Sequence, residues 1–358
     1  MTGESKEVDT GSRIKASKPL YSPSWIDKLN DRVAQRPGPV WAYYLALWLV
    51  LFLSQTTVSW IEGAIDIGDF LLVHGFLAGV ITFMLALFHY LDDRAGKAMH
   101  SLKPILTLSE PKYDEYLYRL TTLPGLRPLL AGLSLVILNL ITELFGGPYH
   151  LALLDDYPVS ATLLRIFYLI GWFVFGNFLY HTAHQLRLIN HIYTNYTRIN
   201  IIRVNQLYSF SNLSAFTAVC LALIVYGWQT VNPEISLSDP IVLAWILGIA
   251  LFSLATFIWP QLGIHRIQVE EKERLIADVN SVYQDVTAEL HQKIAEKELA
   301  EIANVNMAMI NLEMEKATLE KIPTWPWDPE ALRLLITALA LPLGVWLLQL
   351  VLQSFLSS

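Results

Sequence analysis

The chain has 358 residues, of which 54% are hydrophobic and 16% charged, and its formal net charge is −7. Together with a positive mean hydropathy, this composition excludes an ordinary soluble domain and predicts an all-α, polytopic membrane protein. The single cysteine, Cys220, excludes an intrachain disulfide and any zinc or thiol-redox motif built from cysteines.

The chain begins with a polar segment. Residues 1–21 contain no continuous apolar core, so they predict a disordered cytosolic tail rather than a cleavable signal peptide. Residues 22–36 predict a helix that lies in the membrane interface. Ser24 stands at the capping position with Asp27 three residues later, and Trp25 shares one side of this helix with further apolar residues.

Long apolar runs predict the membrane spans. A bilayer core about 30 Å thick needs roughly 20 apolar residues in a helix, and the chain contains seven such runs. We expect spans at 39–61, 69–91, 128–146, 161–181, 207–228, 240–261 and 330–356. Residues 39–262 should therefore form a six-span bundle, in which the fourth span extends as a cytosolic helix over 182–206.

The basic residues predict the orientation. They are concentrated in the segment before the first span and in the second, fourth and sixth connections, whereas the first, third and fifth connections contain no Lys or Arg. Because cytoplasmic loops carry the excess of Lys and Arg, the pattern predicts an N-in, C-out protein of the inner membrane, with a cytoplasmic N-terminus and an extracytoplasmic C-terminus. This orientation disfavours rhodopsins and G-protein-coupled receptors.

Polar side chains in the outer half of the predicted bundle are candidates for a ligand site. Glu143 and Arg165 fall at similar depth on consecutive spans and could form an ion pair. Gln55, His74 and Asn139 lie in the same half. These five side chains could form an outward-facing polar vestibule that binds a small ligand or an ion. Alternatively, they could make interhelical hydrogen bonds with a purely structural role.

Three histidines follow the end of the fourth span. His181, His184 and His191 share one helical face, and imidazoles at such spacing can ligate a metal or sense pH. The alternative is a polar lining where the helix leaves the bilayer. The complete histidine boxes of membrane di-iron oxygenases are missing, and the sequence leaves any cofactor unknown.

Residues 263–322 predict a cytosolic, coiled-coil-like helical region. From 264 to 322 the chain contains no Gly or Pro and carries apolar residues at helical spacing. The segment could be one bent helix or a hairpin that turns around 295–304. Its narrow apolar seam could pack within the chain or against the same element of a second copy, which would make the protein a homo-oligomer.

Residues 323–358 predict a hinge followed by the seventh span. Prolines end the preceding helix, tryptophans suit the headgroup level, and an aspartate can cap the next helix. These hinge or anchor residues are Pro323, Trp325, Pro326, Trp327 and Asp328. A plain aromatic belt without further role is the alternative.

Two stretches carry a family resemblance. "GIHRIQVEEKERL" at 263–275 and "IPTWPW" at 322–327 resemble a family of uncharacterised bacterial multi-span membrane proteins, and the resemblance implies no activity. The N-in, seven-span layout is also similar to that of insect chemoreceptor channels, although the Thr-Tyr and Gln-Phe signature of their last span is absent.

The functional expectation is an oligomeric sensor or ligand-gated, channel-like protein that is not an enzyme. The alternatives are a small-solute transporter and a metal-dependent membrane enzyme. Expected partners are the lipid bilayer, a second copy through the cytosolic helices, and an unknown small ligand or ion. Basic and acidic residues are intermixed, so no nucleic-acid partner is expected.

Overall fold

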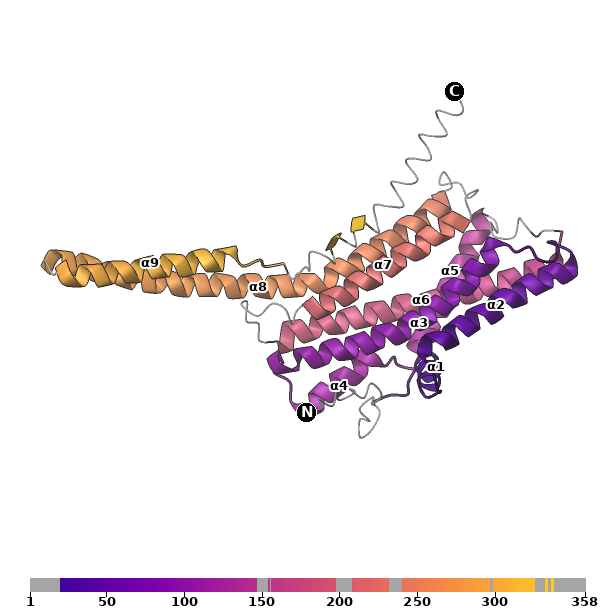
Figure 1. Cartoon of the computed structure of the whole chain (residues 1–358), viewed down its shortest axis with the longest axis horizontal. Helices are drawn as coiled ribbons and strands as arrows, with labels where there is room; N and C mark the ends of the chain where they lie inside the picture. The colour runs from indigo at the N-terminus through magenta and orange to yellow at the C-terminus, as the bar shows by residue number, and fades with distance from the viewer. Residues whose placement is uncertain are drawn as a thin grey trace, which may run out of the picture.

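The computed structural model describes residues 20–146, 154, 156–197, 208–231, 240–296, 299–325, 332–333 and 336–337. Over these residues the fold is all-helical, with isolated bridges in place of strands (Figure 1). The elements are α1 (Trp25–Ala34), α2 (Val40–Glu62), α3 (Leu72–Leu102), η1 (Lys103–Ile105), α4 (Glu110–Thr121), α5 (Arg127–Gly146), α6 (Pro158–Tyr196), α7 (Tyr208–Val231), α8 (Pro240–Glu296) and α9 (Leu299–Lys321).

Six helices in the described residues are long and apolar enough to cross a membrane. The predicted spans 39–61, 128–146 and 207–228 match α2, α5 and α7 within three residues at each end. Helices α3, α6 and α8 continue well beyond their predicted spans, because polar residues that favour helix follow the apolar run. The predicted seventh span, 330–356, lies almost wholly outside the described residues.

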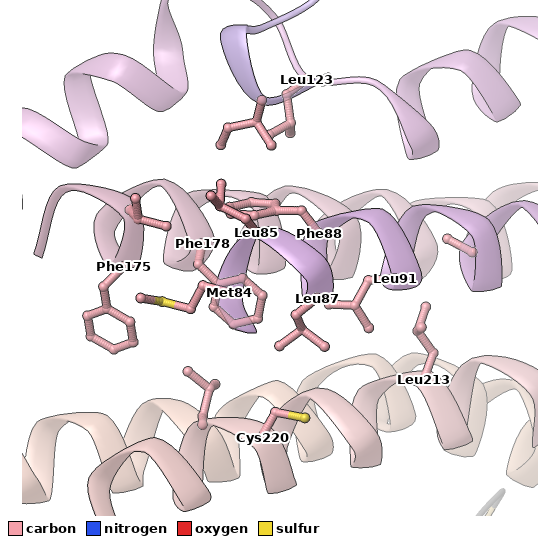
Figure 2. Close-up of a cluster of buried hydrophobic side chains, with 14 of the residues drawn as sticks. Met84, Leu85, Leu87, Phe88, Leu91, Leu123, Phe175, Phe178, Leu213 and Cys220 are labelled. Carbon is pink, nitrogen blue, oxygen red and sulfur yellow. The ribbon is translucent and has the colours of Figure 1, made fainter. Parts of the chain in front are cut away.

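The buried core lies where α3, α6 and α7 meet (Figure 2). Phe88 of α3 and Phe178 of α6 are fully buried and pack edge to face, with ring centroids 5.4 Å apart. Met84 of α3 and Cys220 of α7 belong to the same cluster. Helices α3 and α6 are therefore the central pair, and the other long helices pack around them.

Helices α5 and α6 cross at glycines. A Cβ atom on Gly176 would lie 2.7 Å from the carbonyl oxygen of Ala131 and 2.9 Å from the Cα atom of Gly132. Both neighbours are backbone atoms, so they cannot rotate away. Small residues at such crossings let two backbones approach closely in a membrane, where packing rather than hydrophobic burial holds helices together.

Helix α1 docks on this bundle. The predicted capping box is present, since the side chains of Ser24 and Asp27 each accept from the other's backbone amide. Asp27 and Asn30 are buried along with Ile26, so α1 packs with polar as well as apolar side chains against protein. A helix that lay in the membrane interface without contacting other helices would keep the side chains of Asp27 and Asn30 in water.

Helix α8 extends past the other helices and folds back as a hairpin with α9, as Figure 1 shows. We call residues 265–296 with α9 the hairpin. Its inner seam contains Val279 and Leu319, with Leu275 and Leu312 packed beside them. Of the two shapes that the sequence allowed, the structure has the hairpin, and its seam packs within one chain.

The end of the hairpin is fastened to α8. The ring of Trp325 stacks on His265, with centroids 3.8 Å apart, and His265 Nδ1 lies 3.0 Å from the carbonyl oxygen of Thr324. Lys272 Nζ donates to the carbonyl oxygen of Ile322 at 2.9 Å. Of the predicted hinge residues, Trp325 thus contacts α8, and Pro323 lies in the same short segment. Pro326, Trp327 and Asp328 lie outside the described residues.

The glycine crossing makes a matched pair of variants possible. Gly176→Ala should destabilise the protein by about 1–3 kcal/mol, because the added methyl group meets rigid backbone. Gly248→Ala on α8, where nothing lies within 4 Å of an added Cβ, should be neutral or slightly stabilising. Thermal unfolding of the purified variants in detergent measures both. Equal midpoints for the two would contradict the crossing.

Candidate functional site

A cavity of about 150 Å³ lies among α3, α5, α6, α7 and α8. Its wall consists mostly of aromatic and aliphatic side chains, with a few polar groups. The lining residues are Phe76, Leu77, Val80, Asn139, Thr142, Glu143, Tyr168, Gly171, Trp172, Phe175, Ile224, Val225, Trp228, Ile241, Val242, Trp245, Ile246 and Ile249. We call this space the outer cavity, after the half of the bundle that the sequence predicts to face outward. A ring-sized ligand fits an apolar space of this volume.

Aromatic rings from four helices touch one another around the outer cavity. Trp172 of α6 and Trp245 of α8 have centroids 4.5 Å apart, and Tyr168 of α6 lies 5.9 Å from Trp228 of α7. Phe76 of α3 lies 5.8 Å from the same tryptophan. Because the contacts join different helices, the rings hold the shape of the wall.

A carboxylate completes the wall. Glu143 Oε2 accepts from Arg165 Nη2 at 2.8 Å, and the side chain of Glu143 is 9% exposed while that of Arg165 is 37% exposed. The amide of Asn139, oriented to suit its neighbours, donates to Glu143 Oε1 at 3.2 Å and accepts from Tyr168 Oη at 3.2 Å. Glu143 is therefore largely shielded, with a partner for each carboxylate oxygen, and Arg165 is the more exposed member of the pair.

The predicted vestibule divides into two groups. Asn139 and Glu143 line the outer cavity and Arg165 pairs with Glu143 from outside it, whereas Gln55 and His74 contact each other between α2 and α3 and do not line it. His74 Nδ1 lies 3.3 Å from Thr56 Oγ1. Depth along each span places all five residues in one layer, but the sequence does not give the direction in which each helix face points.

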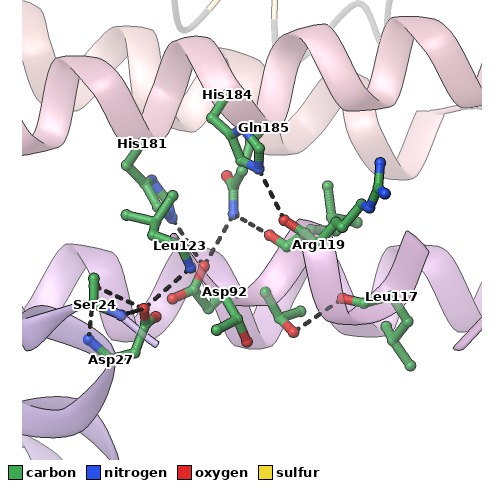
Figure 3. A network of polar contacts seen from close by, with 12 residues as sticks. Ser24, Asp27, Asp92, Leu117, Arg119, Leu123, His181, His184 and Gln185 are labelled. Atoms are coloured by element: carbon green, nitrogen blue, oxygen red, sulfur yellow. Dashed lines mark hydrogen bonds and ion pairs between the residues drawn. The ribbon is translucent and has the colours of Figure 1, made fainter. Parts of the chain in front are cut away.

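A second polar cluster is buried at the other ends of α3 and α6 (Figure 3). Asp92 Oδ1 of α3 lies 2.8 Å from His181 Nε2 and accepts from Gln185 Nε2 at 3.1 Å. Gln185 also donates to the carbonyl oxygen of Leu120, where α4 ends. The side chains of the Asp92–His181 pair are 6% and 1% exposed. The pair joins the two central helices and is almost completely shielded from solvent.

Asp27 of α1 lies beside this cluster, as Figure 3 shows. Its Oδ2 atom accepts from Ser24 N at 2.9 Å, Ser24 Oγ at 2.7 Å and Leu123 N at 3.1 Å. Burial raises the pKa of Asp27 from 3.8 to about 6; the carboxylate of Asp92 adds to the rise, and the hydrogen bonds from Ser24 and Leu123 oppose it. Two buried acids, Asp27 of α1 and Asp92 of α3, therefore lie where α1 docks on the bundle.

The three histidines of the predicted metal site have separate partners. His181 pairs with Asp92, His184 Nε2 donates to the carbonyl oxygen of Arg119 at 3.0 Å, and His191 Nε2 lies 3.1 Å from Tyr116 Oη. Across the described ranges, no group of three or more His, Cys, Asp or Glu side chains could hold a metal ion. The structure does not bring these histidines together.

Sequence reasoning missed Asp92 and the aromatic wall. Asp92 directly follows the predicted second span, at the same end of the bundle as His181, and that shared depth is the signal that could have paired them. Trp172 and Trp245 carry no such signal, because aromatic residues inside apolar spans suit lipid contact equally well.

No protein-family model matches the chain, and no curated protein or solved structure matches it. The resemblance to uncharacterised bacterial membrane proteins stays a prediction.

Asp27 should make the stability of the protein depend on pH. Its pKa is higher in the folded than in the unfolded chain, so it contributes stability below pH 4 that is lost as the pH rises through about 6. Asp27→Asn keeps an oxygen acceptor for the three donors but does not titrate. In this variant the free energy of unfolding should therefore not show the decrease of about 2–3 kcal/mol that Asp27 causes as the pH rises. Thermal unfolding between pH 4 and 7 measures this loss. Glu110→Gln, at an exposed residue of α4, is the control. If the stability of the wild type and of Asp27→Asn changed with pH in the same way, Asp27 would not be the titrating group.

Proposed function

We propose that the protein is a membrane sensor without enzymatic activity, in which a small ligand binds the outer cavity and the hairpin carries the response. The proposal includes the seven-span, N-in, C-out topology in the inner membrane. In that orientation the cavity lies in the outer half of the bilayer, and the hairpin lies in the cytoplasm.

One observation carries the proposal. Helix α8 supplies Trp245, Ile246 and Ile249 to the wall of the outer cavity, and the same helix continues through Pro260 to Glu296 in the hairpin. A continuous helix is stiff, so a displacement of its wall residues by a ligand moves the distant part of the same element. A ligand shifts the hairpin only if it binds the two positions with different affinity.

The middle of α8 is held on both sides. Ser253 Oγ donates to the carbonyl oxygen of Ala218 in α7 at 2.7 Å, and Gly263 lies so close to Asn190 of α6 that a Cβ atom there would clash. Pro260 interrupts the backbone hydrogen bonds between these two contacts. Helix α8 is thus held in its middle, with the proposed ligand site at one end and the hairpin at the other. This arrangement favours tilting or bending of α8 as the way in which ligand binding reaches the hairpin.

The proposed sensor is a homo-oligomer. Side chains of Met307, Ile310 and Met314 on α9 are exposed, although the seam of the hairpin is already filled from within the chain. Methionine-rich helical surfaces adapt to partners, so this side of α9 is where a second copy would pack.

A small-solute carrier is the second candidate. The buried Asp92–His181 pair between α3 and α6 favours it, because ionisable groups inside a membrane bundle often mark proton pathways. Solute uptake in proteoliposomes that responds to a pH gradient, and that Asp92→Asn abolishes, would support a carrier over a sensor.

Filling the cavity tests the sensor proposal without a known ligand. Ile246→Phe adds a ring to the cavity wall, whereas Leu247→Phe adds the same ring to the next residue, which is 52% exposed on α8. We expect Ile246→Phe to change amide hydrogen exchange in 265–296 and in α9 by threefold or more, and Leu247→Phe to leave it as in the wild type. Unchanged exchange in Ile246→Phe, in a protein that still folds, would overturn the proposal.

A further inference from the structure

The wall of the outer cavity combines aromatic rings with one acid. Of its lining residues, all of which the structure describes, Glu143 is the only charged side chain, and none is Lys, Arg or His. We infer that the ligand is an organic cation whose ammonium group is fully alkylated and which carries an apolar part. This inference rests on the proposed function and names the ligand class of its site.

The position of the Glu143–Arg165 pair makes the charge that faces the outer cavity negative. Arg165 does not line the outer cavity but a neighbouring hollow beside Ile137 and Leu144, and Glu143 is the one residue that borders both spaces. The carboxylate therefore stands between the outer cavity and the guanidinium group. A ligand in the cavity meets the negative group first, so a cation is attracted and an anion is repelled.

The rings supply a second attraction. The faces of aromatic rings carry partial negative charge, and several of them around one space form a cage for a cation. Trp172 and Trp245 lie against each other on one side, and Tyr168 and Trp228 form a second pair. Because α6, α7 and α8 each contribute, the cage exists only in the assembled bundle.

The hydrogen bonds of the wall favour an ammonium group without N–H donors. Asn139 and Arg165 each donate to the carboxylate of Glu143, and Tyr168 Oη donates to Asn139. On the same wall, Trp245 Nε1 donates to Thr142 Oγ1 at 3.3 Å. A primary ammonium has three N–H donors to satisfy, whereas each oxygen of Glu143 already accepts one hydrogen bond, so part of the hydration that it loses would not be replaced. A quaternary ammonium makes no hydrogen bonds in water, so it loses less on entering the cavity and keeps the attraction of the rings.

The experiment compares two ligands of the same shape. Phenyltrimethylammonium and tert-butylbenzene differ in one atom, a charged nitrogen in place of a carbon. The full-length protein in uncharged detergent is titrated with each, and binding is followed by calorimetry and tryptophan fluorescence. We expect the cation to bind at least tenfold more tightly than the neutral compound.

Two variants locate the effect. Glu143→Gln should weaken cation binding about tenfold and leave tert-butylbenzene binding unchanged. Trp228→Leu should also weaken cation binding, whereas Trp41→Leu, which removes a tryptophan that is 67% exposed on α2, should not. Because two residues on different helices are tested, loss of folding in one variant leaves the other informative.

The remaining outcomes separate the ligand class from the function. If tert-butylbenzene binds as tightly as the cation, or if Glu143→Gln and Trp228→Leu both keep full cation affinity, the inference is overturned. Failure of both compounds to bind also overturns it. None of these results affects the comparison of Ile246→Phe with Leu247→Phe, which uses no ligand and therefore decides the sensor proposal separately.

Discussion

The structure depends on one long helix that must satisfy its backbone hydrogen bonds in two different surroundings. A single segment that crosses lipid must be helical, because only a helix pairs the backbone amides and carbonyls within the segment itself. Beyond the apolar run, the polar part of α8 has no Gly or Pro after Gly263, so nothing ends the helix before Glu296. The wall of the outer cavity and the hairpin are therefore parts of the same helix, and the proposed function follows from that continuity.

The bundle buries charge in two ways. At the outer cavity, Glu143 is covered while Arg165 remains partly exposed, so the pair can respond to a ligand on the covered side. At the other ends of α3 and α6, both members of the Asp92–His181 pair are buried, with helix α1 docked beside them. Removing one partner of such a closed pair leaves an uncompensated buried charge, which makes it a strong constraint on how α3 and α6 pack.

The sequence predicted the features that depend on composition along the chain. Three helices, α2, α5 and α7, match their predicted spans because their apolar runs end where the helix ends. For α3, α6 and α8 the helix continues into polar residues. The predicted helical stretches at 182–206 and 263–322 anticipated this for α6 and α8, whereas the extension of α3 to Leu102 was not predicted. The Glu143–Arg165 pair was predicted from shared depth. Gln55 and His74 were grouped with it by depth but do not line the same cavity, because depth does not give the direction in which a helix face points. Asp92 was missed because a single acidic residue directly after an apolar run is usually exposed to water at the end of the span.

The continuity of α8 can be measured directly. Spin labels at Leu247, beside the cavity wall, and Val282, in the hairpin, occupy residues that are 52% and 49% exposed on the same helix. Their separation of 35 positions along the chain corresponds to roughly 52 Å in an unbroken helix. Pulsed electron paramagnetic resonance on the purified protein should give one narrow distance distribution near this value. A broad distribution, or a maximum below about 40 Å, would mean that α8 is broken or sharply kinked between the cavity and the hairpin, and would contradict the account.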